Sequence, residues 1–165
     1  MKLNGIVPKV EREVVIPILS DTVSLYFIAK PIASYDPFEA LCPMPKARMG
    51  GELGKERPMV ETSDYKEAMR KHGQLFAEWV NVTTLAEVAG SDGKREAIDW
   101  ETVDLEQIET YPNWRVELKE NNGLSESDIR RIELEVLRCN SMDEALIEKA
   151  KEDFLAIAKR SATMT

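Results

Sequence analysis

Apolar and polar residues alternate in two short segments near the start of the chain. In residues 10–19, VEREVVIPIL, the apolar positions have the even spacing of a β-strand with one buried face. Residues 23–32, VSLYFIAKPI, repeat the alternation after the polar residues SDT at 20–22. This pattern predicts an antiparallel β-hairpin, whose edges are free to pair within the chain or between copies.

The segment after the hairpin predicts a short helix and then a linker. In YDPFEALCP, residues 35–43, Asp36 suits an N-cap and Pro37 suits the first helical position, which predicts one or two helical turns. Residues 43–62 contain three prolines, three glycines and seven charged residues. This composition is typical of a flexible linker.

The apolar period changes to that of a helix in residues 63–90. From Tyr65 to Ala86, apolar residues recur every three or four positions, which predicts an amphipathic helix of about seven turns that stops near Gly90. Gly73 inside this helix costs about 1 kcal/mol relative to alanine. The β-branched residues within 80–84 weaken its second half, and a loop over 91–111 is expected to follow.

Three more helices are predicted in the last third of the chain. Pro112 opens a short helix, PNWRVELKEN, that Gly123 closes. SESD at 125–128 is close to a capping box, with Asp in the place of the usual Glu, and SMDE at 141–144 matches the full pattern. The helices that these boxes start are predicted to form an αα-hairpin. Their apolar faces comprise Ile129, Ile132, Val136 and Cys139 in the first helix, and Leu146, Ala150, Phe154 and Ile157 in the second.

Together these elements predict an α+β fold. It consists of an N-terminal β-hairpin with a short helix in residues 1–42, a flexible Pro/Gly-rich linker in 43–62, and a mostly helical region in 63–165 that ends in the αα-hairpin. We expect the hairpin and the helical region to form one compact unit, because an isolated hairpin is marginally stable in water.

Length and composition fit a single globular domain. The chain has 165 residues, of which 43% are hydrophobic and 32% are charged, and this excludes full disorder. No apolar run approaches the ~18 residues of a membrane span, and residues 1–10 lack the apolar core of a signal peptide. We therefore expect a cytoplasmic protein with no membrane contact. Cys42 and Cys139 have no further ligands at metal-binding spacing, so two reduced thiols and no zinc site are expected.

The net charge of −8 is concentrated in the second part of the chain. Residues 1–62 are neutral, whereas residues 63–165 carry 22 acidic and 14 basic residues, with six acids and no base between Glu96 and Glu109. Nucleic-acid binding depends on Lys and Arg that neutralise phosphates, so this charge argues against a nucleic-acid partner. We interpret the acidic stretch as a solvated loop, with an acidic docking surface or DNA mimicry as the alternatives.

No residue pattern predicts an active site or a bound cofactor. MPKARMGGELGKERP, residues 44–58, differs from a phosphate-binding loop because Met49 replaces its first glycine and Glu56 replaces its magnesium-binding Ser or Thr. His72 is the only histidine, and its place on the apolar face of the long helix favours a partly buried, hydrogen-bonded residue over an acid–base catalyst. Neighbouring acidic pairs are interpreted as solvated faces rather than magnesium or glycosidase sites. We therefore predict a protein that is not an enzyme, with no catalytic residues, no metal ligands and no cofactor.

Three aromatic residues in or beside the acidic stretch are the candidate partner-binding residues. Trp100, Tyr111 and Trp114 belong to residue types that are over-represented among interface anchors. The alternative is that these side chains pack the acidic loop onto the helices.

The order of these segments resembles that of the tail assembly chaperones, small proteins encoded among the tail genes of tailed bacteriophages. The resemblance covers nearly the whole chain and rests on its layout: VVIPI and SLYFIAKPI, YDPFEALCP, the charged linker, SDYKEAMRKHGQLFAEW, IDWETVD, and the stretch from YPNWRVELKENNG to KEDFL. It implies a non-enzymatic protein of the host cytoplasm that binds the helical tape-measure protein, or other tail proteins, until the tail tube polymerises. Self-association is possible through the hairpin edge. The family has no active-site residues.

Three other interpretations stay open. A structural or connector protein of the virion would be found in finished particles, unlike a chaperone. An acidic inhibitor of a host nuclease would bind a basic protein with strong salt dependence, but the Lys and Arg residues interspersed in the last two helices argue against DNA mimicry. A small enzyme would require a perturbed carboxylate in a deep pocket.

We predict that residues 44–60 are mobile, because linker composition provides few apolar contacts. Limited proteolysis of the native protein should cut this segment first, which mass spectrometry of the fragments would show. A segment that resists the protease as long as the rest of the chain would contradict the prediction.

Overall fold

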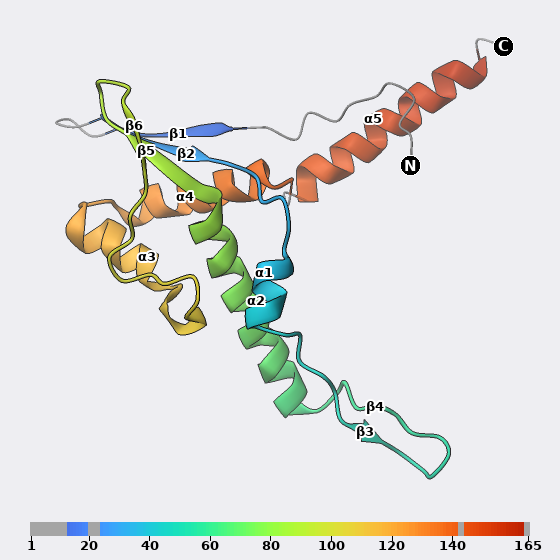
Figure 1. Cartoon of the computed structure of the whole chain (residues 1–165). Helices are drawn as coiled ribbons and strands as arrows, with labels where there is room; N and C mark the ends of the chain where they lie inside the picture. The colour runs from blue at the N-terminus through green and yellow to red at the C-terminus, as the bar shows by residue number, and fades with distance from the viewer. Residues whose placement is uncertain (1–12, 20–23, 142–143, 164–165) are drawn as a thin grey trace. The chain divides into compact units, whose positions relative to one another are not determined.

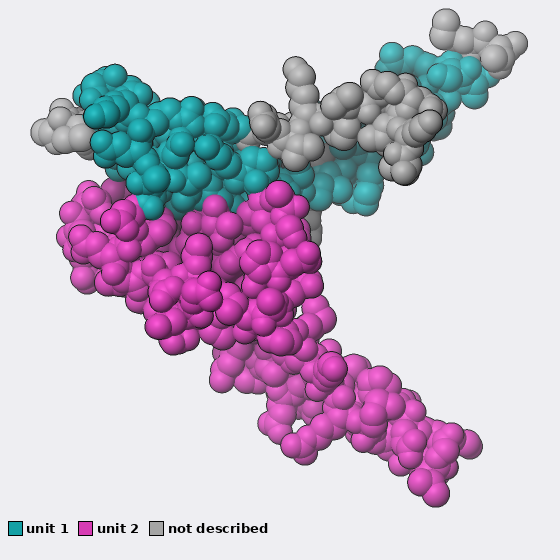
Figure 2. Space-filling model, viewed as in Figure 1, with its two compact units in different colours: residues 1–31, 84–98, 125–165 teal, residues 32–83, 99–124 magenta. Residues whose placement is uncertain are grey.

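A computed structural model describes residues 13–19, 24–141 and 144–163. The chain divides into two compact units (Figure 2). Unit 1 comprises residues 1–31, 84–98 and 125–165, and unit 2 comprises residues 32–83 and 99–124. The mixed α+β class is confirmed. Each unit is assembled from separate stretches of sequence, and the expected division at residues 42 and 62 stays a prediction.

Unit 1 contains a four-stranded antiparallel sheet. The strands follow the spatial order β1-β2-β5-β6 (Figure 1). Their bounds are β1 Val14–Leu19, β2 Ser24–Ala29, β5 Leu85–Ala89 and β6 Arg95–Ala97.

The alternation of the first two strands sets the buried face of this sheet. Ile16 pairs with Phe27 and both side chains are buried, whereas Val15 on the opposite face is 57% exposed. The two strands that the sequence predicts are therefore present. Ile16 and Phe27 share a buried face, but Ile28 on the opposite face of β2 is also only 3% exposed, so burial in β2 does not follow the alternation along its whole length. Val10 and the SDT segment lie outside the described residues.

The predicted long helix is shorter than expected. α2 (Ser63–Thr84) ends at Thr84 instead of near Gly90, and β5 follows it directly. The β-branched residues at the end of α2 have weak helix propensity, and β5 gains strand pairing on both of its sides, with β2 and with β6. This pairing overrides the helical period of residues 85–89. The expected loop at 91–111 is likewise interrupted by β6, after a turn in which Gly93 has a φ of 76°.

Thr84 fixes the point at which α2 becomes β5. Its side chain is fully buried. Its carbonyl oxygen accepts a hydrogen bond of 2.9 Å from the N–H of Lys30, the residue after β2. Its hydroxyl oxygen accepts a bond of 2.8 Å from the side-chain amide of Asn140, at the end of α4 (Glu126–Cys139). One residue therefore joins three elements of unit 1.

A cluster of charged residues lies on the Val15 face of the sheet. Arg95 of β6 binds Glu13 at 2.9 Å and Glu87 of β5 at 2.5 Å, and Lys30 binds Glu87 at 3.3 Å. The hydrogen bonds from Arg95 are the main cause that holds the pKa of Glu13 and the pKa of Glu87 below their usual range. Because these side chains are accessible to solvent, we expect the cluster to position β6 rather than to contribute much to stability.

α4 buries the face that the sequence predicts. The guanidinium of Arg131 donates a 2.8 Å hydrogen bond to the carbonyl of Pro17 in β1. The capping box at the start of α4 is confirmed: the Ser125 hydroxyl accepts from the N–H of Asp128 at 3.2 Å, and the Asp128 carboxylate accepts from the N–H of Ser125 at 3.0 Å. The buried residues of α4 are Ile129, Ile132, Val136 and Cys139.

α5 (Glu144–Thr163) differs from α4 because every side chain that the structure describes in it is exposed. The αα-hairpin requires the apolar faces of α4 and α5 to pack together, and it stays a prediction. Ser141 has a φ of 57° and ends α4. Residues 142–143 of the second capping box lie outside the described residues.

Unit 2 is mostly helical. α1 begins at Asp36, with Tyr35 at the N-cap, so Asp36 is the first helical residue rather than the cap. Pro112 and Gly123 bound the next helical segment as predicted, and Gly123 has a φ of 68°. The unit contains α1 (Asp36–Leu41), α2 up to Thr83, η1 (Ile108–Thr110), α3 (Asn113–Val116) and the π-helix η2 (Glu117–Asn121).

Part of the predicted linker forms a small antiparallel ribbon. β3 (Met49–Gly50) pairs with β4 (Arg57–Pro58), and Gly51 and Gly54 between them have φ angles of 118° and 82°. Most side chains in residues 43–62 are exposed, so the ribbon adds little packing. The mobility of this segment stays a prediction.

Among the helices in the described ranges, none combines the length and the apolar composition needed to cross a membrane.

The capping box gives a pH-dependent test of the fold. We predict that Ser125→Ala lowers the free energy of unfolding by about 1 kcal/mol at neutral pH, because the N–H of Asp128 loses its acceptor. Hydrogen bonds from the Ser125 N–H and hydroxyl hold the pKa of Asp128 below its usual range. The Asp128 carboxylate therefore contributes to the free energy of unfolding at pH values above its pKa in the unfolded chain. This contribution is lost as the pH falls through the lower pKa of Asp128 in the folded state.

Urea denaturation should show that Ser125→Ala is less stable at neutral pH than Ser127→Ala, an exposed control in the first turn of α4. The difference should narrow in acid, where Asp128 is protonated, without vanishing, because the hydrogen bond from the Asp128 N–H to the Ser125 hydroxyl does not titrate. Equal stabilities of the two variants at neutral pH would show that the box contributes nothing.

Candidate functional site

Two of the three predicted partner-binding aromatics lie in the interior. Tyr111 and Trp114 are both 0% exposed. The Tyr111 hydroxyl donates to the carbonyl of Leu105 at 2.7 Å, and the indole N–H of Trp114 donates to the carboxylate of Glu78 in α2. The guanidinium of Arg115 binds the same carboxylate at 2.8 Å. The packing alternative therefore describes Tyr111 and Trp114, which offer no surface to a partner in this conformation.

Trp100, the third predicted residue, is partly exposed at the start of the acidic loop. This part of the loop is anchored by Glu117 of η2, which is buried. The Glu117 carboxylate accepts hydrogen bonds from the N–H of Glu101 at 2.8 Å, and from the N–H and hydroxyl of Thr102 at 3.0 Å and 2.6 Å. The six acids between Glu96 and Glu109 are all exposed. Trp100 and these acids are therefore not gathered into a pocket with Tyr111 and Trp114.

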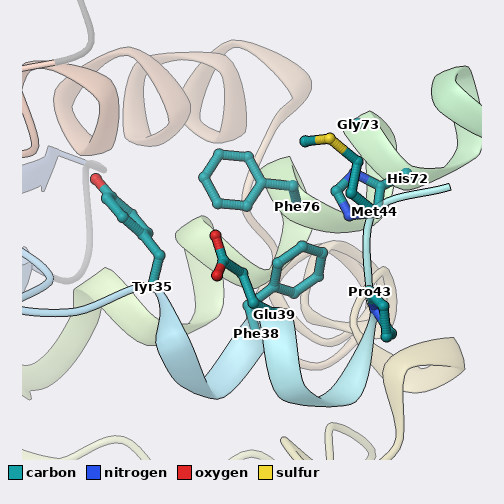
Figure 3. Close-up of a pocket in the computed structure, with 8 residues that line it drawn as sticks. All are labelled: Tyr35, Phe38, Glu39, Pro43, Met44, His72, Gly73 and Phe76. Atoms are coloured by element: carbon teal, nitrogen blue, oxygen red, sulfur yellow. The ribbon is translucent and has the colours of Figure 1, made fainter. Parts of the chain in front are cut away.

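An open pocket of about 580 Å³ lies instead between α1 and α2 of unit 2. We call it the aromatic pocket (Figure 3). Tyr35 lies at one end, and His72 and Met44 lie at the other. Its lining consists of Tyr35, Phe38, Glu39, Pro43, Met44, His72, Gly73 and Phe76.

Ring contacts between the two helices form the wall of the aromatic pocket. Phe38 of α1 is 1% exposed, and its ring centroid lies 5.3 Å from those of Phe76 and His72 and 5.5 Å from that of Trp79. Tyr35 meets Phe76 edge-on, with the centroids 5.5 Å apart. Such tilted and edge-on pairs are favourable arrangements of aromatic rings, so the wall is held by packing that is already complete without a ligand.

His72 has a structural role at one end of this wall. Its Nε2 lies 3.1 Å from the carbonyl oxygen of Cys42, the residue that follows α1, and the side chain is partly buried. The predicted partly buried, hydrogen-bonded histidine is confirmed. Burial raises the pKa of the Cys42 thiol, which disfavours the reactive thiolate.

Gly73 lies on the open side of the aromatic pocket. It belongs to α2 and is absent from the described residues with positive φ. A Cβ built at this position would meet nothing within 4 Å. Neither the backbone conformation nor internal packing therefore requires a glycine, although glycine costs the helix about 1 kcal/mol relative to alanine. The missing side chain leaves the helix backbone accessible from the pocket.

The chemistry of the aromatic pocket suits an apolar side chain of a partner. Aromatic rings belong to four of its eight lining residues, Glu39 places one carboxylate at its edge, and Met44 is 64% exposed and flexible enough to adapt to an incoming group. Within the described ranges, no group of three or more His, Cys, Asp or Glu side chains is arranged to hold a metal ion.

Part of this pocket follows from the local sequence pattern. His72 and Phe76 are four residues apart on the predicted apolar face of α2, and a glycine at position 73 is unfavourable in a helix. The contribution of Tyr35 and Phe38 depends on how α1 packs against α2, which the local pattern does not contain.

Comparisons of the chain with known protein families, with curated proteins and with solved structures found no match. Function is therefore inferred from the aromatic pocket and from the order of segments along the chain.

We predict that Gly73→Ala raises the free energy of unfolding by about 1 kcal/mol, because the methyl group has open space and alanine favours the helix. The matched control is Ala77→Gly, at an exposed position one turn further along α2, which should lower stability by a similar amount. Urea denaturation measures both. A loss of stability in Gly73→Ala would mean that the fold itself needs this glycine.

Proposed function

We propose that this protein is a non-enzymatic tail assembly chaperone of a tailed bacteriophage, and that it binds a helical segment of the tape-measure protein in the host cytoplasm. The observation that carries the proposal is the aromatic pocket with Gly73 on its open side. The layout of the chain, which resembles that of tail assembly chaperones, supplies the identity of the partner.

The shape of the aromatic pocket fits a helix better than an extended peptide. An amphipathic helix presents apolar anchors one turn apart, and the rings of Tyr35, Phe38 and Phe76 offer one recess for such an anchor. At Gly73 the missing Cβ allows a neighbouring backbone to approach closely. A helix that places one large apolar side chain between the rings and rests against Gly73 would use both features.

Charge adds a preference for the sequence of the bound helix. Glu39 lies at the edge of the aromatic pocket and is exposed, so a Lys or Arg close to the apolar anchor would find an opposite charge. The net charge of −8 would help to keep a complex with an apolar client in solution.

The first experiment is a pull-down with the tagged protein from infected or prophage-induced cells, followed by mass spectrometry of the captured proteins and of purified virions. We expect a large, helical phage protein to be captured, and we expect the chain to be missing from virions. Gly73→Leu should reduce capture by about tenfold or more by filling the pocket, equivalent to about 1.4 kcal/mol. Gln74→Leu adds the same side chain at an exposed position outside the pocket and should capture normally.

Other outcomes would overturn the proposal in distinguishable ways. The chain in mature particles would make it a structural or connector protein. Capture of a basic host nuclease, released steeply by salt, would make it an acidic inhibitor. Equal capture by Gly73→Leu and Gln74→Leu would place the binding surface outside the aromatic pocket.

A further inference from the structure

α5 carries a row of large apolar side chains on its surface. Phe154 is 67% exposed, Ile157 is 58% exposed and Ile147 is 39% exposed. Ile147 and Phe154 line a shallow, mostly apolar surface of the helix together with Ala150, Lys151 and Leu155. A continuous apolar row of this kind marks a site of protein interaction.

The spacing of this row is that of a helix that pairs with another helix. Steps of three and four residues alternate along it, which is the period of the a and d positions of a coiled coil. A helix in such a pair buries these positions against the equivalent positions of its partner. The row consists of Ile147, Ala150, Phe154 and Ile157, and the polar Ser161 takes the next position of the same period.

We propose that the partner is a second copy of this chain, and that the two α5 helices pair antiparallel. In this arrangement Phe154 of each copy packs against Ile157 of the other, so the largest apolar side chains of the row meet at the two-fold axis. The same surface serves both copies, as a two-fold interface requires.

The charges beside the row favour a second copy of the chain as the partner, and they favour the antiparallel direction. Asp153 and Arg160 lie on the same flank of the row, two turns apart. Along one helix they are separated by about 10 Å, too far for an ion pair. In the antiparallel pair the flank of one copy meets the same flank of the other, so Asp153 of each copy lies beside Arg160 of the second copy. Two equivalent ion pairs form.

A parallel pair of α5 helices does not bring Asp153 beside Arg160 of the second copy. There, each flank meets the opposite flank of the second helix, and Asp153 lies beside Ala158 of the second copy. The antiparallel arrangement therefore gives Asp153 and Arg160 partners of opposite charge, which the parallel arrangement does not. A small residue on the other flank, Ala158, allows the helices to approach closely.

This inference goes beyond the proposed function, because α5 and the aromatic pocket are separate surfaces. A dimer would carry two aromatic pockets, and two linked sites bind a long helical client more tightly than one site does. The α5 pair itself does not depend on the identity of the client.

Sedimentation of the purified full-length chain over a dilution series tests the proposal. We expect a reversible dimer that Phe154→Asp converts to a monomer with an unchanged circular dichroism spectrum in the near ultraviolet, because Phe154 is exposed in the single chain. The matched control is Ala156→Asp, which places the same charge on the opposite side of α5 and should leave the dimer intact.

Charge exchange tests the direction of the pair. Asp153→Arg and Arg160→Asp, each made singly, should weaken the dimer by about tenfold or more, because two ion pairs are replaced by two repulsive contacts. The double variant, which exchanges the two charges, should restore wild-type affinity. Glu152→Arg, on the outer side of α5, should have little effect.

Three results would overturn the proposal. A wild-type chain that stays monomeric at every accessible concentration would show that another occupant covers the row. If removal of residues 1–12 then produced dimers, that occupant would be the chain's own first segment. A dimer that Phe154→Asp leaves intact, or that the charge exchange fails to restore, would show a different interface. None of these results depends on whether the tape-measure protein binds.

Discussion

The hydrogen bonds of Thr84 decide how unit 1 is assembled. Its carbonyl binds the chain just after β2 and its hydroxyl binds the end of α4, so the start of β5 is fixed against two other elements at once. A slip of one residue in β5 would turn the buried Leu85, which pairs with Ala29, toward the opposite face of the sheet. Because Thr84 is itself fully buried, either bond left unmade would leave a polar group without a partner in the interior.

Local signals in the sequence predicted the parts of the fold that local chemistry determines. The alternation around Ile16 and Phe27 identified two strands, and the residues around Ser125 and Asp128 identified the start of α4, because strand period and helix capping depend on residues close in sequence. The predicted end of α2 near Gly90 is wrong because residues distant in sequence determine where the helix ends. Residues 85–89 fit a helical period, and pairing with β2 and β6, which are distant or weakly patterned, makes them a strand.

The difference between local and long-range determinants also explains which residues of the candidate site could be predicted. The pattern correctly marked His72 as a partly buried residue of α2. It could not show that Trp114 would bind the carboxylate of Glu78 or that Tyr111 would lie in the interior. α2 has two uses in unit 2. Glu78 binds the side chains that follow Pro112, while the residues from His72 to Phe76 line the aromatic pocket with α1. Interior contacts on one side of α2 therefore hold the pocket on another side in a defined shape, which limits the entropy lost on binding.

The interleaving of the two units has a consequence for the order in which a ribosome can complete them. Unit 2 has all of its residues once position 124 has been made, whereas unit 1 lacks α4 until position 139 has been made. During that interval the nascent chain carries β1, β2, β5 and β6 without the buried side chains of α4, so apolar strand surface is exposed before its cover exists. The stretch from Ser125 to Cys139 is therefore the segment whose synthesis protects the sheet from aggregation, and a chain released before it would retain an uncovered sheet face.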